Sequence, residues 1–151
     1  MFRLEMIAGW GDMDFNSHMR NTAYLDKSGD ARMIFFKENG FPMKEFVKNG
    51  IGPVVRKDEI EYFKEVGLLE KFHVTLSLAG LSDDGSHFIL QNDFWKKDGK
   101  LIAKVKSTGG WLNLSARKLS SPPNELLKTL HKLTKTEKYK TLSSSVKSIK
   151  E

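Results

Sequence analysis

The sequence predicts an α+β fold in which one long helix packs against a mostly antiparallel sheet. The helix is expected over residues 22–39, where good helix formers precede an Asn-Gly-Phe-Pro stop. The sheet is expected within residues 53–116, which are rich in Val, Ile, Leu, Phe and Thr and are divided by turn signals. A chain of 151 residues is long enough for one domain with a real core, so the helix must bury a face against the sheet.

The chain before the helix predicts a strand and a polar turn. Residues 2–10 alternate loosely between apolar and polar side chains, as a strand with one buried face does. Gly9 and Gly11 flank Trp10 and permit a bend there. The polar turn over residues 12–20 then leads directly into the helix.

The long helix has recognisable signals at both ends. Asn21 or Thr22 can serve as its N-cap, because both side chains accept hydrogen bonds from free backbone N–H groups. Gly40 can take the left-handed position after the last turn, and Pro42 cannot continue a helix. Residues 43–49 are expected to form one further short helix.

Strands dominate the next part of the sequence. Four are expected, over residues 53–63, 70–81, 86–97 and 100–116. Asp98-Gly99 between two alternating runs is a strong hairpin signal, and Gly109-Gly110 marks a bend in the last strand. Together with the first strand, these segments predict an antiparallel sheet of about five strands.

A C-terminal helix is expected after Ser121-Pro122-Pro123, because serine caps helices and proline is favoured in the first turn. Its apolar stripe consists of Leu126, Leu127, Leu130 and Leu133. Residues 136–151 contain few apolar side chains and predict a basic, weakly ordered tail. We therefore expect a single domain over residues 1–135, followed by this tail.

Composition restricts the class of protein. The net charge is +6 and cysteine is absent, which excludes disulfides and thiolate nucleophiles. Residues 1–7 lack the apolar core of a signal peptide, and no apolar run approaches the roughly 20 residues of a membrane helix. We therefore expect a cytoplasmic protein with no membrane partner.

The excess positive charge lies mostly near the C-terminus, where residues 118–151 contain eight Lys and three Glu. A basic tail can contact nucleic acid, and such binding would depend steeply on salt and be lost on deletion of residues 134–151. Apart from Tyr139, however, the tail has no interleaved aromatic side chain, and it has no arginine cluster. A solvated tail is the favoured interpretation, so no nucleic-acid partner is expected.

The densest group of reactive side chains lies in the polar turn and at the start of the long helix. Asp12, Asp14 and His18 belong to the turn, and Asn21 begins the helix. Backbone N–H groups at a helix start can polarise a carbonyl group, while a nearby carboxylate attacks it or activates water. This part of the sequence is therefore the candidate catalytic site.

Metal binding is the alternative for this turn. Asp12-x-Asp14-x-Asn16 is similar to the start of a calcium loop, but that loop needs Gly at its sixth position and Glu at its twelfth. The sequence has Ser17 and Ala23 there. Zinc would need three or four suitable ligands, and the chain has four His, no Cys and no second His in this turn. We expect no metal and no cofactor.

The turn also resembles a family signature. The pattern Asp-x-Asp-x-x-Gly-His-x-Asn-Asn-x-x-Tyr-Leu, followed by Ala-Arg, is similar to that of hotdog-fold acyl-CoA thioesterases of the 4-hydroxybenzoyl-CoA thioesterase type. The matching positions are Asp12, Asp14, His18, Asn21, Tyr24, Leu25, Ala31 and Arg32. Ser17 stands where the family prefers Gly. Residues 54–63 resemble the family's second strand, and the resemblance covers residues 3–116.

The resemblance implies a hotdog fold, in which a sheet wraps around the central helix, and hydrolysis of an acyl-CoA or acyl-carrier-protein thioester. It implies that Asp14 is the catalytic nucleophile or general base. The backbone N–H of Asn21 would polarise the thioester carbonyl, His18 would line the site, and Tyr24 would lie beside the acyl group. No serine-centred Gly-x-Ser-x-Gly motif competes with this assignment.

The resemblance also implies an oligomer, because hotdog sites form between subunits. A homodimer or homotetramer is expected. The partner subunit would then supply substrate-binding residues from its second strand, around Val54, Val55 and Arg56.

Two alternatives stay open. Asp14 and His18 could simply order the turn, and Asn21 could be a plain helix cap, which is compatible with its catalytic role. The whole domain could also be a non-catalytic hotdog module that binds acyl-CoA or an acyl-carrier protein as a sensor or subunit. The presence of Asp14 argues against that second alternative.

Overall fold

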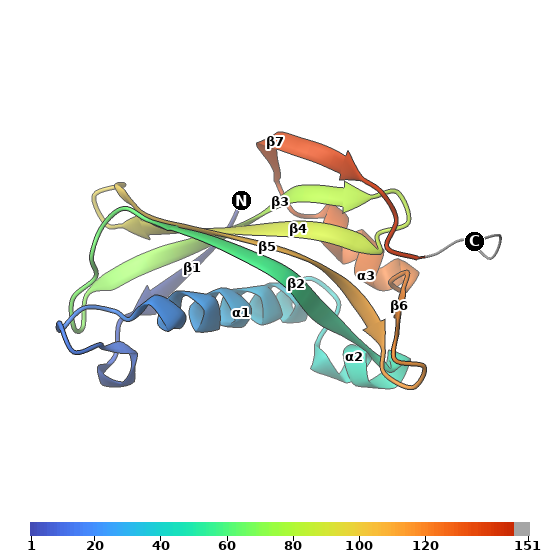
Figure 1. Cartoon of the computed structure of the whole chain (residues 1–151), viewed down its shortest axis with the longest axis horizontal. Helices are drawn as coiled ribbons and strands as arrows, with labels where there is room; N and C mark the ends of the chain where they lie inside the picture. The colour runs from blue at the N-terminus through green and yellow to red at the C-terminus, as the bar shows by residue number, and fades with distance from the viewer. Residues whose placement is uncertain (147–151) are drawn as a thin grey trace.

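A computed structural model describes residues 1–146 of the chain (Figure 1). Its centre is a seven-stranded sheet in which five strands follow the order β1-β3-β4-β5-β2. Neighbours on this path are antiparallel, and the strands are Phe2–Ile7 (β1), Ile51–Tyr62 (β2), Lys71–Ser82 (β3), His87–Lys96 (β4) and Leu101–Asn113 (β5). Outside this path, Lys118–Ser120 (β6) pairs with β5 and Lys135–Leu142 (β7) pairs with β3. The expected sheet of about five strands was therefore too small.

Three α-helices accompany the sheet, at Asn21–Glu38 (α1), Met43–Asn49 (α2) and Asn124–His131 (α3), and a 3-10 turn spans Trp10–Asp12 (η1). The long helix α1 runs along one face of the curved sheet, with α2 and α3 near its C-terminal end (Figure 1). The prediction of one long helix and a C-terminal helix is thus correct in place, but α2 also contributes to the core. The side chains that α1 buries are Ala23, Tyr24, Ser28, Ala31, Phe35 and Phe36.

The end of α1 has the geometry that its sequence predicts. Gly40 has φ 100°, in the left-handed region that glycine adopts without steric cost. The N–H of Phe41 then donates to the carbonyl of Phe36 at 2.8 Å, and the Phe41 side chain is fully buried. This turn directs the chain back under the sheet and so positions α2.

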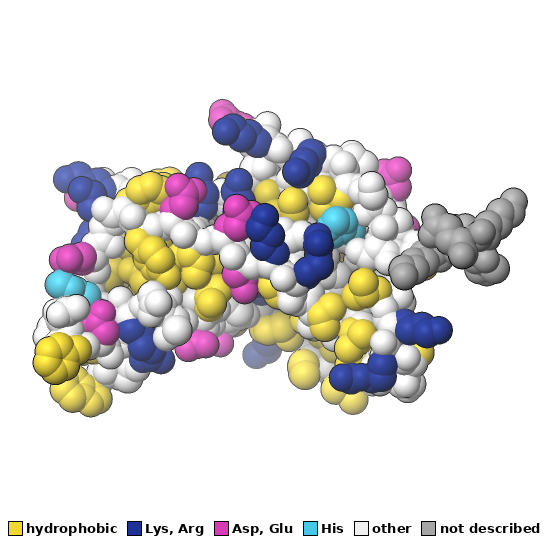
Figure 2. Space-filling model, in the orientation of Figure 1, with side chains coloured by type: hydrophobic (Ala, Val, Ile, Leu, Met, Phe, Trp, Pro, Cys, Tyr) yellow, Lys and Arg dark blue, Asp and Glu magenta, His cyan; other side chains and the backbone are white. Residues whose placement is uncertain are grey.

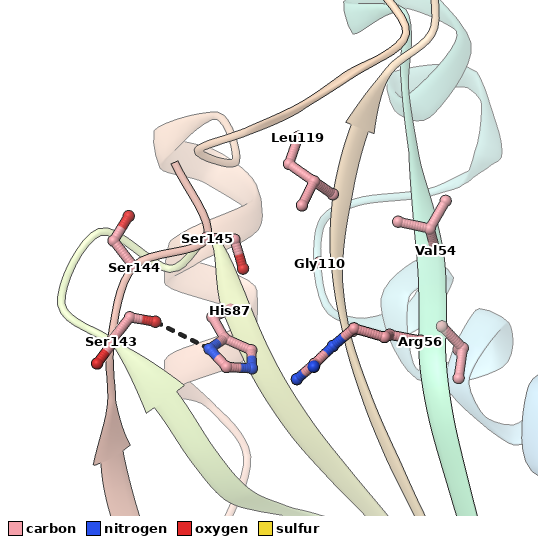
Figure 3. A pocket seen from close by; sticks show the side chains of 10 residues that line it. Val54, Arg56, His87, Gly110, Leu119, Ser143, Ser144 and Ser145 are labelled. Carbon is pink, nitrogen blue, oxygen red and sulfur yellow. Dashed lines mark hydrogen bonds between the residues drawn. The ribbon is translucent and has the colours of Figure 1, made fainter. Parts of the chain in front are cut away.

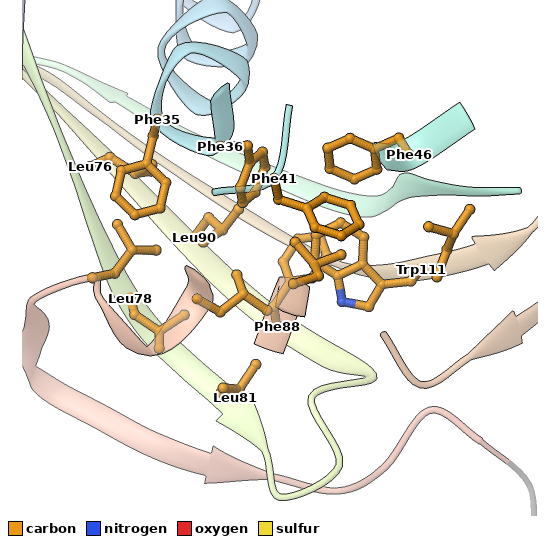
Figure 4. Packing of buried hydrophobic residues seen from close by; sticks show 14 residues of the cluster. Phe35, Phe36, Phe41, Phe46, Leu76, Leu78, Leu81, Phe88, Leu90 and Trp111 are labelled. Carbon is orange, nitrogen blue, oxygen red and sulfur yellow. The ribbon is translucent and has the colours of Figure 1, made fainter. Parts of the chain in front are cut away.

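Aromatic side chains fill the core at the C-terminal end of α1 (Figure 4). Trp111 from β5 lies at its centre, is completely buried, and donates its indole N–H to the Gly85 carbonyl at 2.9 Å. The rings around it meet edge-on or tilted, and they belong to Phe36, Phe46 and Phe88. Because the indole N–H has a partner, the burial of Trp111 leaves no polar group unsatisfied.

A half-buried arginine joins α1 to the middle of the sheet. Arg32 donates from Nε to Asn92 Oδ1 at 3.0 Å and from Nη2 to Ser107 Oγ at 2.7 Å. Ser107 in turn donates its hydroxyl hydrogen to the Asp58 carboxylate on β2. Burial lowers the pKa of Arg32 to about 10, although the Asp58 charge opposes this. Four elements are therefore linked through one guanidinium.

The tail differs from its prediction. Residues 136–142 were expected to be weakly ordered, but they belong to β7, which runs parallel to β3 and aligns Lys140 with Gly80 and Leu142 with Ser82. The physical reason is a free sheet edge: β1 covers the outer side of β3 only up to Leu76, and β7 covers it from Leu78 onward. Residues 147–151, which complete the predicted tail, lie outside the described residues.

Strand β2 pairs on one side only, with β5. A bulge at Arg56 interrupts the pairing, between Val55 and Lys57. From Arg56 to Tyr62, nearly every side chain is exposed. Within the part of the chain that the structure describes, the outer edge of β2 is therefore free.

Candidate functional site

The polar turn is fixed to α1 by Asp12. Its Oδ2 accepts the Gly9 N–H at 2.8 Å and lies 3.0 Å from the ammonium group of Lys27. Burial alone would raise the pKa of Asp12, but the hydrogen bonds from Gly9 and Lys27 outweigh it and lower the pKa. Asp12 therefore stays charged and acts as a positioning residue for the turn.

Asp14 closes the turn with one of its two carboxylate oxygens. Its Oδ1 accepts the backbone N–H groups of Asn16 at 2.8 Å and His18 at 3.2 Å. Ser17, between them, has φ 64°, which explains why glycine suits that position. Among residues 1–146, nothing donates to the second oxygen, Oδ2. The carboxylate is exposed and keeps one oxygen available to a ligand.

A small pocket lies beside this carboxylate. Its volume is about 300 Å³. The lining residues are Trp10, Met13, Asp14, Ser17 and Leu68. Trp10 and Leu68 are apolar side chains that remain largely exposed, so the pocket combines one charge with an apolar wall.

The side chain of His18 pairs with Glu65. Its Nε2 lies 3.1 Å from Glu65 Oε2. The contacts between His18 and Asp14 are made by the His18 backbone, which donates to Asp14 Oδ1 and accepts from the Asp14 N–H. The sequence predicted that His18 would lie in the site, and it is adjacent to Asp14 through the main chain.

The N-terminus of α1 begins directly after the turn. Arg20 is its N-cap and makes no side-chain capping hydrogen bond. The backbone N–H of Asn21 has no acceptor within residues 1–146, which leaves a donor at the positive end of the helix dipole. The hydroxyl of Tyr62 donates to the Asn21 carbonyl at 3.3 Å and brings the end of β2 to the same place.

Tyr24 is part of the core beneath the site. Its side chain is 2% exposed and packs edge-on against Tyr62 and Phe94, with ring centroids 5.2 and 5.1 Å apart. Burial first, and then the neighbouring Tyr62 and Glu70, raise the pKa of Tyr24 to about 12. Tyr62, rather than Tyr24, presents an exposed aromatic surface here.

Val54, Val55 and Arg56 lie at the opposite end of β2. They line a pocket of about 330 Å³ together with His87, the glycine pair 109–110, Leu119 and the serines 143–145 (Figure 3). Tyr62 lies eight residues after Val54 along the strand, a length of roughly 26 Å at about 3.3 Å per residue. Within one chain, the structure therefore brings Asp14, His18 and Asn21 together and leaves residues 54–56 apart.

The residues that the sequence did not single out come from distant segments. Tyr62 and Glu65 approach the turn because β2 and the loop after it return along the sheet. His87 joins Arg56 only through the pairing of β4, β5 and β2. No local pattern marks any of the three.

Two further observations concern metal ligands and membrane helices. Among residues 1–146, no group of three or more His, Asp or Glu side chains is placed to hold a metal ion. No helix in that part of the chain is long and apolar enough to cross a membrane.

A family model and several solved structures are similar to this chain. A family model described as the thioesterase-like superfamily matches residues 8–130. A hypothetical protein from Aquifex aeolicus is 24% identical, with a TM-score of 0.79 over 86% of this chain and 99% of that one. A Staphylococcus aureus protein solved in complex with CoA is 21% identical, with a TM-score of 0.79 over 89% and 86% of the two chains. A gentisyl-coenzyme A thioesterase is 21% identical, with a TM-score of 0.76 over 85% and 99%.

At these identities, the three solved structures establish a shared fold. No curated protein sequence matches this chain.

Proposed function

Because the chain belongs to the thioesterase-like superfamily and has the hotdog fold, we propose that it is an acyl-CoA thioesterase whose catalytic carboxylate is Asp14. Two observations support this proposal: the Asp14 carboxylate has one oxygen without a donor, and α1, which begins seven residues later, starts with a backbone N–H that has no acceptor among residues 1–146. Asp14 uses Oδ1 to close the turn, and the Asn21 N–H has no acceptor among residues 1–146. One group can attack or activate water while the other polarises a carbonyl.

The reaction can follow either of two routes. As general base, Asp14 removes a proton from water, the water oxygen bonds to the thioester carbon, the C–S bond breaks and the departing thiolate takes up the proton. As nucleophile, Asp14 attacks the thioester carbon, the C–S bond breaks and the thiolate leaves, which gives a mixed anhydride. Water then hydrolyses the anhydride to the free acid and the Asp14 carboxylate, and the thiolate takes up the proton that the water gives up. In both routes the Asn21 N–H stabilises negative charge on the carbonyl oxygen.

The free edge of β2 supports a homodimer, alone or within a tetramer. Two copies of β2 paired antiparallel about Asp58 would place Val54 of one protomer opposite Tyr62 of its partner, because the residue numbers of such pairs have a constant sum. Tyr62 contacts Asn21, so residues 54–56 would reach the partner's site. Figure 2 shows exposed hydrophobic side chains gathered on the face where β2 lies.

The acyl group has an apolar surface available beside α1. A pocket of about 380 Å³ begins at Leu25, one helical turn after Asn21, and extends to Phe36 and Trp111. Tyr24 lies beneath its start, in the core. An acyl-carrier protein could present the same thioester, and the cytoplasmic location expected from the sequence stays a prediction.

The proposal is tested by release of free thiol from a panel of aliphatic and aromatic acyl-CoA esters. Asp14→Asn should lower kcat by about 10²-fold or more, because the amide cannot act as base or nucleophile. Asp98→Asn is the matched control: Asp98 also accepts a backbone N–H within its own turn, from Lys100 at 3.0 Å, but lies in the β4–β5 hairpin. Equal turnover of both variants would reject Asp14 as the catalytic group.

One observation favours a second candidate function. The hydrogen bonds to Asp14 Oδ1 are those of a turn-closing residue, which a non-catalytic acyl-CoA-binding module would also need. Binding of acyl-CoA without turnover of any ester by the wild-type protein would support that module and reject hydrolysis.

A further inference from the structure

The pocket at the end of β2 has a chemical character of its own. Its lining comprises two basic side chains, three serines and apolar groups, and it contains no carboxylate (Figure 3). We call it the His87 pocket; it is lined by Val54, Val55, Arg56, His87, Gly109, Gly110, Leu119, Ser143, Ser144 and Ser145. The larger groove under β7 differs, because Glu59, Glu61 and Asp93 lie there among the lysines. The lining of the His87 pocket therefore favours an anion more than the lining of that groove does.

The imidazole of His87 has an unused nitrogen. Its Nδ1 lies 2.8 Å from the Ser143 carbonyl oxygen, and because a carbonyl only accepts, Nδ1 carries the hydrogen. The opposite nitrogen, Nε2, is buried and has no partner within the described residues. Buried polar atoms without a hydrogen-bond partner are uncommon. The free Nε2 therefore indicates that a ligand group can form a hydrogen bond with it.

Arg56 faces this nitrogen from the other side of the pocket. In Figure 3 its guanidinium extends from β2 towards the His87 ring. Arg56 makes no ion pair or hydrogen bond with any of residues 1–146. Its fork of N–H donors suits a phosphate or a carboxylate.

The remaining walls are held in fixed positions. Asp84 accepts hydrogen bonds from the hydroxyls of Ser86 and Ser144, and the N–H of Ser145 donates to Ser86 Oγ at 2.8 Å. The glycine pair forms the floor, and a Cβ on Gly110 would come within 2.7 Å of the Ser86 carbonyl oxygen. The pocket is thus a built cavity rather than a gap between mobile side chains.

We propose that the His87 pocket binds a phosphate monoester, with Arg56 on the phosphate oxygens and His87 Nε2 on the same group. A monoester suits both partners better than a carboxylate, since its second pKa is about 6 and it has both acceptor oxygens and a titratable O–H near neutral pH. The phosphate O–H donates to Nε2, and the guanidinium of Arg56 donates to the other phosphate oxygens. The 3′-phosphate of coenzyme A is the source that we assign, and this assignment rests on the proposed function.

The assignment is compatible with the dimer proposed above. In that dimer residues 54–56 reach the partner's Asn21, so the His87 pocket would receive the nucleotide end of a substrate whose thioester lies at the partner's Asp14. Binding of the phosphate does not require hydrolysis of the thioester. The binding experiment can therefore contradict the phosphate site without contradicting the thioesterase proposal, and the turnover experiment can do the reverse.

The test is isothermal titration calorimetry of the full chain with coenzyme A, dephospho-coenzyme A, adenosine 3′,5′-bisphosphate and inorganic phosphate. The wild type should bind coenzyme A about tenfold or more tightly than dephospho-coenzyme A. Arg56→Gln and His87→Asn should remove this difference. His87→Asn retains an N–H donor near the Nδ1 position, so it keeps the bond to Ser143 while Nε2 is lost.

Lys57→Gln is the control for charge, because Lys57 follows Arg56 on the same strand but does not line the pocket. It should keep the preference for coenzyme A. Equal binding of coenzyme A and dephospho-coenzyme A, with the bisphosphate and inorganic phosphate still dependent on Arg56, would overturn the coenzyme A assignment in favour of another phosphate. Binding of every ligand unaffected by Arg56→Gln and His87→Asn would overturn the site.

Discussion

Asp14 and His18 are joined twice through the main chain of the polar turn: Oδ1 of Asp14 accepts the His18 N–H at 3.2 Å, and the Asp14 N–H donates to the His18 carbonyl at 2.8 Å. The reciprocal pair fixes the direction of the Asp14 carboxylate before any substrate arrives. It also means that Asp14 has a structural contribution that is separable from catalysis.

Two substitutions of Asp14 should separate these contributions. Asp14→Asn keeps an acceptor oxygen for the turn and should leave the free energy of unfolding nearly unchanged. Asp14→Ala removes two side-chain-to-backbone hydrogen bonds and should cost about 1 kcal/mol. Urea denaturation measures both values. Equal stability of the Asn and Ala variants would show that the carboxylate does not support the turn.

Ser17 should be a site of easy stabilisation. Its φ of 64° places a residue with a Cβ in the left-handed region, which costs roughly 1–2 kcal/mol relative to glycine. Ser17→Gly should therefore raise the free energy of unfolding by about 1 kcal/mol, since added freedom of the unfolded chain offsets part of the gain. Ser17→Ala is the control, because it loses the hydroxyl but keeps the strain. The interpretation fails if both variants have the same stability.

Substitution of Asp84 should weaken the attachment of β7 and the serines after it to the sheet. Burial alone would raise the pKa of Asp84, but hydrogen bonds from Ser144, Ser82 and Ser86 hold it well below its usual range. Asp84→Ala should increase hydrogen exchange at residues 140–142 of β7 by about tenfold. Asp83→Ala, an exposed neighbour, should change nothing.

The depressed pKa of Asp84 also predicts that the protection of β7 against hydrogen exchange depends on pH. A carboxyl group whose pKa is depressed by folding stabilises the folded state fully above its unfolded pKa, about 3.9. The stabilisation weakens as the pH falls below that value and is lost once the pH passes the folded pKa. Protection of β7 against exchange should therefore hold at pH 6 and decline below about pH 4. Protection that does not vary with pH in the wild type would exclude the Asp84 bonds as its source.

Arg32 should be sensitive to a conservative change. Lysine cannot reproduce the two hydrogen bonds that the guanidinium donates to Asn92 and Ser107, and one of those partners would be left unsatisfied. Arg32→Lys should cost about 2–3 kcal/mol in urea denaturation. Arg3→Lys, at an exposed ion pair with Glu5, should have almost no effect. A neutral Arg32→Lys would mean that burial of the arginine, not its geometry, matters.

The parts of the site that are contiguous in the sequence could be predicted, and the parts that need strand pairing could not. Asp14 and His18 lie in the polar turn and Asn21 begins the helix directly after it, so their types and spacing were informative. Tyr62 reaches Asn21 only because β2 spans the full length of the sheet. His87 and Arg56 meet across three paired strands, and no local periodicity encodes that register.

The fold shows the same division. The end of α1 follows from Asn39, Gly40 and Pro42, whose conformational preferences are local. Strand β7 depends on a partner, because its segment is too polar to order itself and gains its structure from backbone bonds to β3. Composition indicates whether a segment can order itself through its own residues, but it does not indicate whether the segment can pair with a strand elsewhere in the chain.

The outer edge of β3 has a consequence for how the chain is made. Phe2 pairs with Leu76 and Lys135 with Leu78, so β3 pairs in succession along a single edge with β1 and with β7, which are far apart in the sequence. During translation, β3 leaves the ribosome with half of that edge open until β7 has been synthesised. Open edges recruit other chains. A nascent chain stalled before β7 would thus expose this edge of β3 to pairing with other chains.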